Sequence, residues 1–367
     1  MIKTYLVYLL NELGLYFLRR PLYSPVFNKD EKKIRSSDLV VSARDKRWWN
    51  RRGFHSDKAL YYDRQKAADY ISDMDRRILT ERINKLHRIV VHDKFVFYRF
   101  MDPVADVIPV LILIQRNGKF VFTGSEISSI DDFLGCLFEG LTYVVKPIDG
   151  GGGRNVESIS YSTEKGKILV GKTEIDPKDF TSVISKFGRA IIQPKVFPSG
   201  YSREIFPHSL NTMRVITMID PDTKEPFIAA VSHKFGTTHV GVIDNWKQGG
   251  FLAKVDENTG EIGHGYLYPR RREDFVPKDS HPDSGFRAKG YVIPNWSSFV
   301  VQMKDLASHL EFLAFVGWDV AWDGEKVLVV EANYNPDMSI IQCFGPLLER
   351  PGVRKFYEHH GVIQKGK

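Results

Sequence analysis

Cysteine is scarce in this chain of 367 residues, which has only Cys136 and Cys343, far apart in the sequence. Two distant cysteines do not make the disulfide framework of a small secreted domain, so we expect a reducing, cytoplasmic setting. Long hydrophobic runs are missing as well. The most apolar stretch, residues 1–20, is interrupted by Asn11 and Glu12 and lacks a small-residue cleavage site, which argues against a membrane span or a signal peptide.

Two interpretations of residues 1–20 stay open: an amphipathic helix packed on the protein, and a helix lying on the inner face of a membrane. The net charge of +7 fits phosphates, nucleic acid or a membrane surface as anionic partners. Trp48 and Trp49 stand beside arginines, but no nucleic-acid motif accompanies them. We therefore expect a solvated helical face there and no nucleic-acid partner.

The pattern of elements predicts an α+β chain. Residues 45–92 are charge-rich, with apolar residues at helical spacing, and indicate a helical N-terminal region. Beyond it, apolar runs alternate with helical segments, and no internal repeat or long linker separates them. Predicted helices cover residues 128–138, residues 176–188 with Asp176 as cap, and residues 296–315. Predicted strands cover residues 108–115, 119–124, 142–147, 158–162, 167–171, 189–196, 213–220, 226–236 and 250–256, and two more lie within residues 315–337, around the Asp323-Gly324 turn.

Four consecutive glycines, Gly150, Gly151, Gly152 and Gly153, follow the predicted strand that ends at Lys146-Pro147. Glycines let the backbone approach a ligand closely, and their N–H groups can surround phosphate oxygens, with Lys146 neutralising charge. No Gly-Lys-Ser/Thr follows and no helix opens directly afterwards, which excludes a P-loop and a dinucleotide fingerprint. A flexible hairpin tip is the alternative.

Acidic and amide side chains gather in a predicted hairpin near the C-terminus. Asp319 lies on one strand, and Glu331 and Asn333 end the other, across the Asp323-Gly324 turn. Antiparallel pairing would place these oxygen donors side by side, which suits Mg²⁺. The alternative is a turn cap and a surface ion pair, although an unpaired charge after the apolar run "KVLVV" would be costly.

Arg214 interrupts another apolar strand, in "SLNTMRVITM", and needs an anionic partner, either a protein carboxylate or a bound phosphate. The segment "VGVIDNWKQGGF" offers Asp244, Asn245, Gly249 and Gly250, and is either a substrate-side element or a structural turn. The histidines of this half do not have the spacing of a zinc site.

Taken together and in this order, these pieces resemble the ATP-grasp superfamily, and more closely the sugar-transfer-associated ATP-grasp family of bacterial polysaccharide gene clusters. The motifs that carry the resemblance are "VVKPIDGGGGR", "SLNTMRV", "VIDNWKQGGF" and "VGWDVAWDGEKVLVVEANYNPD", spread over roughly residues 92–345. The resemblance implies an ATP-grasp fold, in which two α+β lobes clasp ATP, here preceded by the helical region. It divides the chain into residues 1–90, residues 91–197 with the smaller lobes and glycine loop, and residues 198–367.

The resemblance also implies roles for individual residues, with ATP and Mg²⁺ as cofactors. Lys146 and Arg214 would be catalytic, and Asp319, Glu331 and Asn333 would hold the metal. The residues implied to bind ATP are Lys94, Lys146, Gly150, Gly151, Gly152, Gly153, Arg154, Gln193, Lys195 and Val196. The residues implied to face substrate are Asn211, Asp244, Asn245, Gly249 and Gly250.

The chain departs from the family pattern at Asn155, where many relatives have a glycine, although asparagine tolerates left-handed backbone. The implied activity is ATP-dependent carboxylate–amine ligation through an acyl phosphate, in cell-surface polysaccharide biosynthesis, with carboxylate and amine substrates that are sugar-linked. Two alternatives stay open: a kinase that moves the γ-phosphate to a hydroxyl, and a non-catalytic nucleotide-binding or membrane-surface module.

Overall fold

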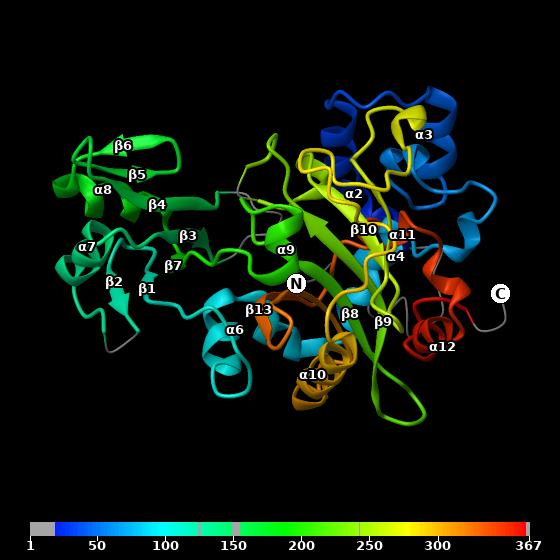
Figure 1. The fold of residues 1–367 in the computed structure, drawn as a ribbon. Coiled ribbons are helices and arrows are strands. Elements are labelled where there is room, and N and C mark those ends of the chain that lie inside the picture. The colour runs from blue at the N-terminus through cyan, green and yellow to red at the C-terminus, as the bar shows by residue number, and fades with distance from the viewer. Residues whose placement is uncertain (1–18, 124–125, 149–154, 242, 365–367) are drawn as a thin grey trace.

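The computed structural model describes residues 19–123, 126–148, 155–241 and 243–364. It contains two antiparallel sheets set side by side, with the first sheet forming the lobe on the left of Figure 1 and the second the larger lobe on the right. Helices cover both sheets, so the α+β class predicted from the sequence is confirmed.

The first sheet has seven strands in the order β2-β1-β7-β3-β4-β5-β6. Its strands are β1 (Ile112–Ile114), β2 (Phe120–Phe122), β3 (Tyr143–Pro147), β4 (Glu157–Ser162), β5 (Lys167–Val170), β6 (Thr173–Ile175) and β7 (Ala190–Pro194). The helices α7 (Ile130–Phe138) and α8 (Phe180–Ile184) pack on it, with Phe133 and Phe180 buried against the apolar side chains of the strands. This burial makes the lobe a stable platform for Lys146 at the end of β3.

The second sheet has six strands in the order β11-β10-β9-β8-β12-β13. Its strands are β8 (Met213–Ile219), β9 (Pro226–Phe235), β10 (Phe251–Val255), β11 (Ile262–Tyr266), β12 (Phe315–Trp322) and β13 (Val327–Asn333). One face carries α5 (Ile89–His92), α6 (Lys94–Met101), α9 (Gly200–Ile205) and α10 (Trp296–His309). Successive strand residues point to opposite faces of a sheet, so on β8 the side chain of Val215 packs in the core on this face and that of Ile216 packs in the core on the opposite face.

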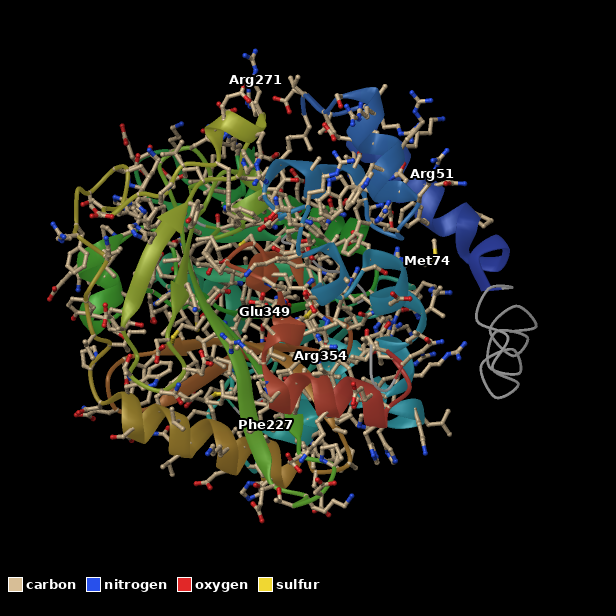
Figure 2. All side chains as sticks on the ribbon, turned by 90° about the vertical axis from the view of Figure 1, so that its right-hand side faces the viewer. Arg51, Met74, Phe227, Arg271, Glu349 and Arg354 are labelled. Atoms are coloured by element: carbon tan, nitrogen blue, oxygen red, sulfur yellow. The ribbon has the colours of Figure 1, made fainter. Side chains whose placement is uncertain are left out.

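The other face of the second sheet is covered by both ends of the chain. Its helices are α2 (Arg19–Arg35), α3 (Ala43–Asn50), α4 (Asp73–Ile78), α11 (Ser339–Gln342) and α12 (Pro351–His359). Figure 2 looks onto this side, where Glu349 and Arg354 lie beside the N-terminal segment. Lys66 pairs with Glu349 and Asp69 with Arg354, each at 2.8 Å. The N-terminal region therefore shares a core with the second sheet. The three-part division of the chain stays a prediction.

Several predicted elements differ in detail. The helical pattern of residues 45–92 forms short α-helices and 3₁₀ turns, because aromatic residues from successive short elements pack on one another, as Trp49 near the end of α3 does on Tyr62 after the next 3₁₀ turn. The helix of residues 176–188 is split into 3₁₀, α and 3₁₀ pieces, and Asp176 makes no cap because its carboxylate accepts from Lys167 Nζ at 2.6 Å. The helix predicted to reach residue 315 ends at His309.

Other local predictions are confirmed. Ser129 caps α7, its hydroxyl accepting from the N–H of Asp132, one residue from the predicted helix start at residue 128. The predicted strands of residues 158–162 and 167–171 pair as β4 and β5, and the hairpin predicted near the C-terminus forms as β12 and β13. Asn155, which replaces the glycine of many relatives, has left-handed backbone with φ of 56°, a conformation that asparagine tolerates.

Asn84 ties the N-terminal region to the start of β12, and we expect Asn84→Ala to cost about 2–4 kcal/mol of unfolding free energy. Its buried amide donates to the Phe315 carbonyl at 2.5 Å and accepts from the Phe315 N–H at 3.1 Å. The substitution leaves both backbone groups without a partner. Urea denaturation measures the loss. Leu86→Ala, at an exposed neighbour, is the control, and an equal effect of the two would contradict the account.

Within the described residues, no helix is long and apolar enough to cross a membrane. Residues 1–18, for which two interpretations were open, lie outside the described part of the chain.

Candidate nucleotide and metal site

A cavity of about 610 Å³ lies between the two sheets. The first sheet contributes the end of β3 and the segment after β7. The second sheet contributes the start of β8, the end of β9, the end of β13 and the loop of residues 243–248. The volume is within the range of small-molecule sites. Residues 194–198 connect the two lobes. A cleft between connected lobes is the arrangement expected for a ligand that contacts both of them.

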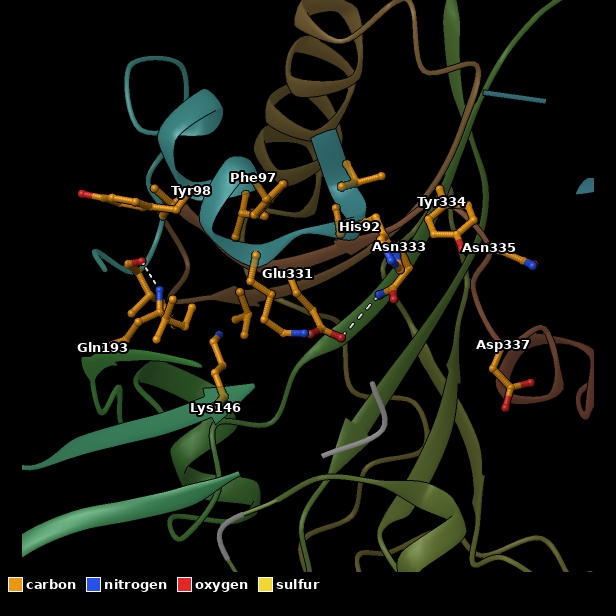
Figure 3. A pocket seen from close by; sticks show the side chains of 18 of the residues that line it. His92, Phe97, Tyr98, Lys146, Gln193, Glu331, Asn333, Tyr334, Asn335 and Asp337 are labelled. Carbon is orange, nitrogen blue, oxygen red and sulfur yellow. Dashed lines mark hydrogen bonds and ion pairs between the residues drawn. The ribbon is translucent and has the colours of Figure 1, made fainter. Parts of the chain in front are cut away.

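Three of the predicted ATP-binding residues line this cavity where the lobes join, Gln193 near the end of β7 and Lys195 and Val196 in the connecting segment. The buried Gln193 amide donates to the Ile108 carbonyl at 2.5 Å, as Figure 3 shows, so it fixes the end of β7 to the segment that precedes β1. The Lys195 N–H donates to the Thr142 carbonyl, and its Nζ lies 5.0 Å from the Phe197 ring centre. Phe197 is 58% exposed, so its ring offers an apolar surface on which a flat ligand ring can stack.

Two lysines enter the cavity from opposite sides. Lys146 ends β3, and Lys94 begins α6, whose cap is Asp93, which accepts from the N–H groups of Phe95 and Val96. Lys94 Nζ lies 4.0 Å from Glu331 Oε2. Burial lowers the pKa of Lys146 to about 8; the neighbouring Glu331 opposes this shift and the charge of Lys94 adds to it. Two cations held close together with one carboxylate suit a ligand that brings negative charge.

The predicted hairpin brings its acids together. Asp319 and Glu331 are directly opposite in the β12–β13 register, as the sequence predicted. Asp319 accepts from Arg214 Nε and Nη2, both at 2.8 Å, and Lys234 Nζ lies 3.0 Å from the same carboxylate. Burial alone would raise the pKa of Asp319, but these two cations hold it well below its usual range. Asp319 is therefore ionised. Of the two anionic partners expected for Arg214, a protein carboxylate or a bound phosphate, the structure shows the carboxylate.

Glu331 and Asn333 are held more loosely, since Asn333 Nδ2 donates to Glu331 Oε1 at 3.4 Å (Figure 3). Two carboxylates and an amide oxygen fit the hard-oxygen preference of Mg²⁺, which keeps waters and shares phosphate oxygens. Arg214 Nη1 is buried with no hydrogen-bond partner in the described structure, so the site retains a donor for an anion. The residues present therefore fit a magnesium–phosphate ligand.

The glycine loop itself, with Gly150, Gly151, Gly152, Gly153 and Arg154, lies outside the described residues. Its two flanks, Lys146 and Val156, line the cavity.

The substrate-side predictions divide into two groups. Asp244 and Asn245 line the cavity, and Asp244 Oδ2 accepts from the N–H and hydroxyl of Thr212, both at 2.7 Å. Asn211 is absent from the lining. Its amide is buried, donates to the Ser202 and Phe206 carbonyls, and accepts from Ser209 and Gly236. It holds the chain that leads into β8.

Gly249 and Gly250 do not line the cavity either. Gly249 has φ of 113°, and a Cβ on Gly250 would lie 3.0 Å from three backbone oxygens. These glycines are required by the tight turn that precedes β10.

Lys234 is the main residue that the sequence reasoning missed. It is buried on β9 and lies between Asp319 at 3.0 Å and Asp244 at 3.6 Å, joining the metal-site acid to the substrate-side acid. A lysine inside the apolar run "FIAAVSHKF" was the available signal, because a buried cation requires a partner.

Because the pKa of Lys146 is about 8, we expect Mg-ADP affinity to be about tenfold weaker at pH 9 than at pH 7. The protonated amine is the form that attracts phosphate, and it is lost as the pH rises through the pKa. Titration calorimetry at several pH values measures this. Lys146→Arg keeps its charge and should flatten the profile. Identical profiles for both proteins would contradict the assignment.

Two α+β lobes with a cleft between them are the arrangement that the resemblance to the ATP-grasp class predicts. The profile of the family described as sugar-transfer associated ATP-grasp matches residues 74–350, which is more than half of the chain. The chain belongs to this family. Members of the ATP-grasp superfamily are mostly ATP-dependent ligases. The search of curated proteins found no match.

Solved structures with a related fold include D-cycloserine synthetase DcsG, which is 13% identical with a TM-score of 0.38, covering 74% of this chain and 73% of that one. D-alanyl-alanine synthetase A from Vibrio cholerae is 10% identical, with a TM-score of 0.38 and coverage of 74% and 61%. D-alanine-D-alanine ligase from Helicobacter pylori is 12% identical, with a TM-score of 0.37 and coverage of 74% and 61%. Similarity this low does not bear on the activity of this chain.

Proposed function

We propose that this protein is an ATP-dependent carboxylate–amine ligase that forms a carbon–nitrogen bond through an acyl phosphate. The observation that carries the proposal is the meeting of Lys94, Lys146, Glu331 and Asn333 at one end of the cleft. A nucleoside triphosphate with its Mg²⁺ requires cations for its phosphate oxygens and oxygen donors for the metal, and these four side chains supply both.

In the proposed reaction, a carboxylate oxygen attacks the γ-phosphorus of ATP and the bond from that phosphorus to the bridging oxygen breaks. ADP leaves, and the acyl phosphate remains in the cleft. The amine nitrogen then attacks the acyl carbon, loses a proton, and inorganic phosphate departs. Lys94 and Lys146 neutralise the phosphate oxygens, and Arg214 contributes its unpartnered Nη1 to the charge that develops.

Glu331 and Asn333, with Asp319, are the residues that would hold Mg²⁺, which when bound supplies charge neutralisation to the phosphates. Lys234 and Arg214 keep Asp319 ionised and oriented. The residues from Asp244 to Trp246 border the cleft, with Asp244 3.6 Å from Lys234, and are the proposed contacts for the amine substrate.

The family description, sugar-transfer associated, supports a role in cell-surface polysaccharide biosynthesis with sugar-linked substrates. We place the protein in the cytoplasm, with no nucleic-acid partner. Contact of residues 1–20 with the inner membrane face remains part of the proposal.

The test measures ADP release from Mg-ATP with pooled uronic acids, amino sugars and amino acids, in the presence of hydroxylamine. A ligase of this kind gives substrate-dependent ADP and a hydroxamate, because hydroxylamine captures the acyl phosphate. A stable phosphorylated product without hydroxamate would identify a kinase instead. ATP binding without turnover in any pool would favour the non-catalytic module.

A further inference from the structure

A second cavity, of about 510 Å³, opens beside the nucleotide cleft. The two cavities have eight lining residues in common. The charged and metal-site residues among them are Lys94, Lys146, Glu331, Asn333 and Asp337, and the others are Ile108, Gln193 and Val330. The connecting segment of residues 194–198 lines only the first cavity, so the nucleotide base is expected there. The proposed γ-phosphate position is then the junction of the two cavities, and a group in the second cavity faces the phosphorus.

The second cavity has an apolar part and a cationic part. Figure 3 shows Phe97 and Tyr98 of α6 over one part, and His92 beside Tyr334 and Asn335 at the other. His92 contacts Tyr334 edge to face, with ring centres 5.4 Å apart. Arg76, from α4 of the N-terminal region, lines the cavity as well. The N-terminal region therefore reaches the loop that directly follows the metal-site residues.

The hydrogen-bond acceptors of the Arg76 guanidinium are all neutral, and Asp337 is a charged group close enough to interact with it electrostatically. Arg76 Nη1 donates to the Asn335 carbonyl and side-chain oxygen, each at 3.1 Å, and to the Pro336 carbonyl at 3.3 Å. Its Nε is buried without a hydrogen-bond partner, and no described carboxylate lies within ion-pair distance of its guanidinium. Arg77 beside it differs, since its Nη2 pairs with Asp30 at 2.7 Å. A half-buried guanidinium with unused donors is suited to a planar anion.

The acids that line this cavity are already engaged. Glu331 belongs to the proposed metal site, and Asp337 pairs with Lys247 at 2.8 Å. Nearby cations, Lys247 first and then Arg76 and Lys58, hold the pKa of Asp337 well below its usual range against its burial. Asp337 is one carboxylate that faces three cations, so it does not neutralise Arg76 completely. The remaining positive charge disfavours a protonated amine and favours an anion.

We propose that the second cavity binds the carboxylate substrate, with Arg76 and His92 as the carboxylate-binding residues and the apolar part under α6 holding the ring or chain attached to it. This assignment rests on the proposed function: ATP lies in the first cavity, and the carboxylate approaches its γ-phosphate from the second. It also gives the N-terminal region a role, since Arg76 both binds substrate and holds Asn335 next to the metal-site residues.

The experiment titrates the full chain with D-glucuronate, D-galacturonate and L-lactate by calorimetry, with and without saturating Mg-ADP, and uses D-glucose as the uncharged comparison. We expect at least one carboxylate to bind the wild-type protein and D-glucose not to bind. Arg76→Gln should weaken carboxylate binding about 10- to 100-fold while Mg-ADP affinity stays within about twofold. Arg51→Gln, on the exposed surface in Figure 2, is the matched control and should bind as wild type.

His92→Gln guards against a folding defect in Arg76→Gln, because His92 is exposed and its replacement leaves the fold intact. It should weaken the same carboxylate without changing Mg-ADP affinity. Absence of binding by every carboxylate at millimolar concentration, or equal binding by wild type and both variants, would overturn the assignment. Failure of the proposed function shows separately, as no Mg-ADP binding or no hydroxamate in a wild-type protein that still binds a carboxylate.

Discussion

Glu331→Gln is expected to reduce substrate-dependent ADP formation by about 10²- to 10³-fold, or about 2.7–4 kcal/mol of barrier. Glutamine keeps the shape of the side chain and removes its charge, so it loses affinity for the magnesium–phosphate group. It also removes the anion that lies 4.0 Å from Lys94 and that supports protonation of Lys146. Steady-state ADP release measures the effect, together with Mg²⁺ dependence.

Glu325→Gln is the control for that substitution, because Glu325 is exposed at the turn of the same hairpin. It should retain the wild-type rate. A Glu331→Gln protein with more than about a tenth of wild-type activity would show that the charge of Glu331 is not needed.

The second large effect is on stability. We expect Asp319→Asn to lower the free energy of unfolding by about 3–5 kcal/mol, because it removes the carboxylate that buried Arg214 and Lys234 share. Urea denaturation at pH 7 measures the loss. Asp305→Asn, at an exposed position on α10, should change stability by less than about 0.5 kcal/mol.

The difference between wild type and Asp319→Asn should depend on pH in one direction. The folded pKa of Asp319 is held well below its unfolded value of about 3.9, so its contribution is fully present above pH of about 4. The contribution is lost as the pH falls from there toward the folded pKa. A stability difference that stays constant from pH 7 to pH 3, or that is below about 1 kcal/mol at pH 7, would show that the ion pairs contribute little.

Much of the site could be predicted from the sequence because its residues sit at fixed places on strands. The Asp323-Gly324 turn sets the register of β12 and β13 as far as Val320, which places Asp319 within one residue of Glu331. A register shift between Asp319 and Val320 then brings Glu331, and not Val330, opposite Asp319. Lys146 follows in the same way from its place at the end of β3. Local pattern carries this kind of information well.

What the sequence did not yield depends on contacts between distant segments. Lys234 and Arg76 meet the site from β9 and α4, and no local pattern tells which acid or carbonyl a buried cation will find. Asn211 shows the converse, since a conspicuous polar residue in a family motif turned out to satisfy backbone groups around β8. The broken N-terminal helices have the same origin, because packing of Trp49 and Tyr62 overrides helical periodicity.

Transfer of oxygen from the carboxylate to phosphate tests the central claim most directly. The protein would be incubated with Mg-ATP, the amine pool and the carboxylate that supports turnover, labelled with ¹⁸O in both carboxyl oxygens. An acyl-phosphate ligase places one labelled oxygen in each released phosphate and leaves the other in the product, because the attacking oxygen departs with phosphorus. Inorganic phosphate without label, or a phosphorylated product with no free phosphate, would contradict the account.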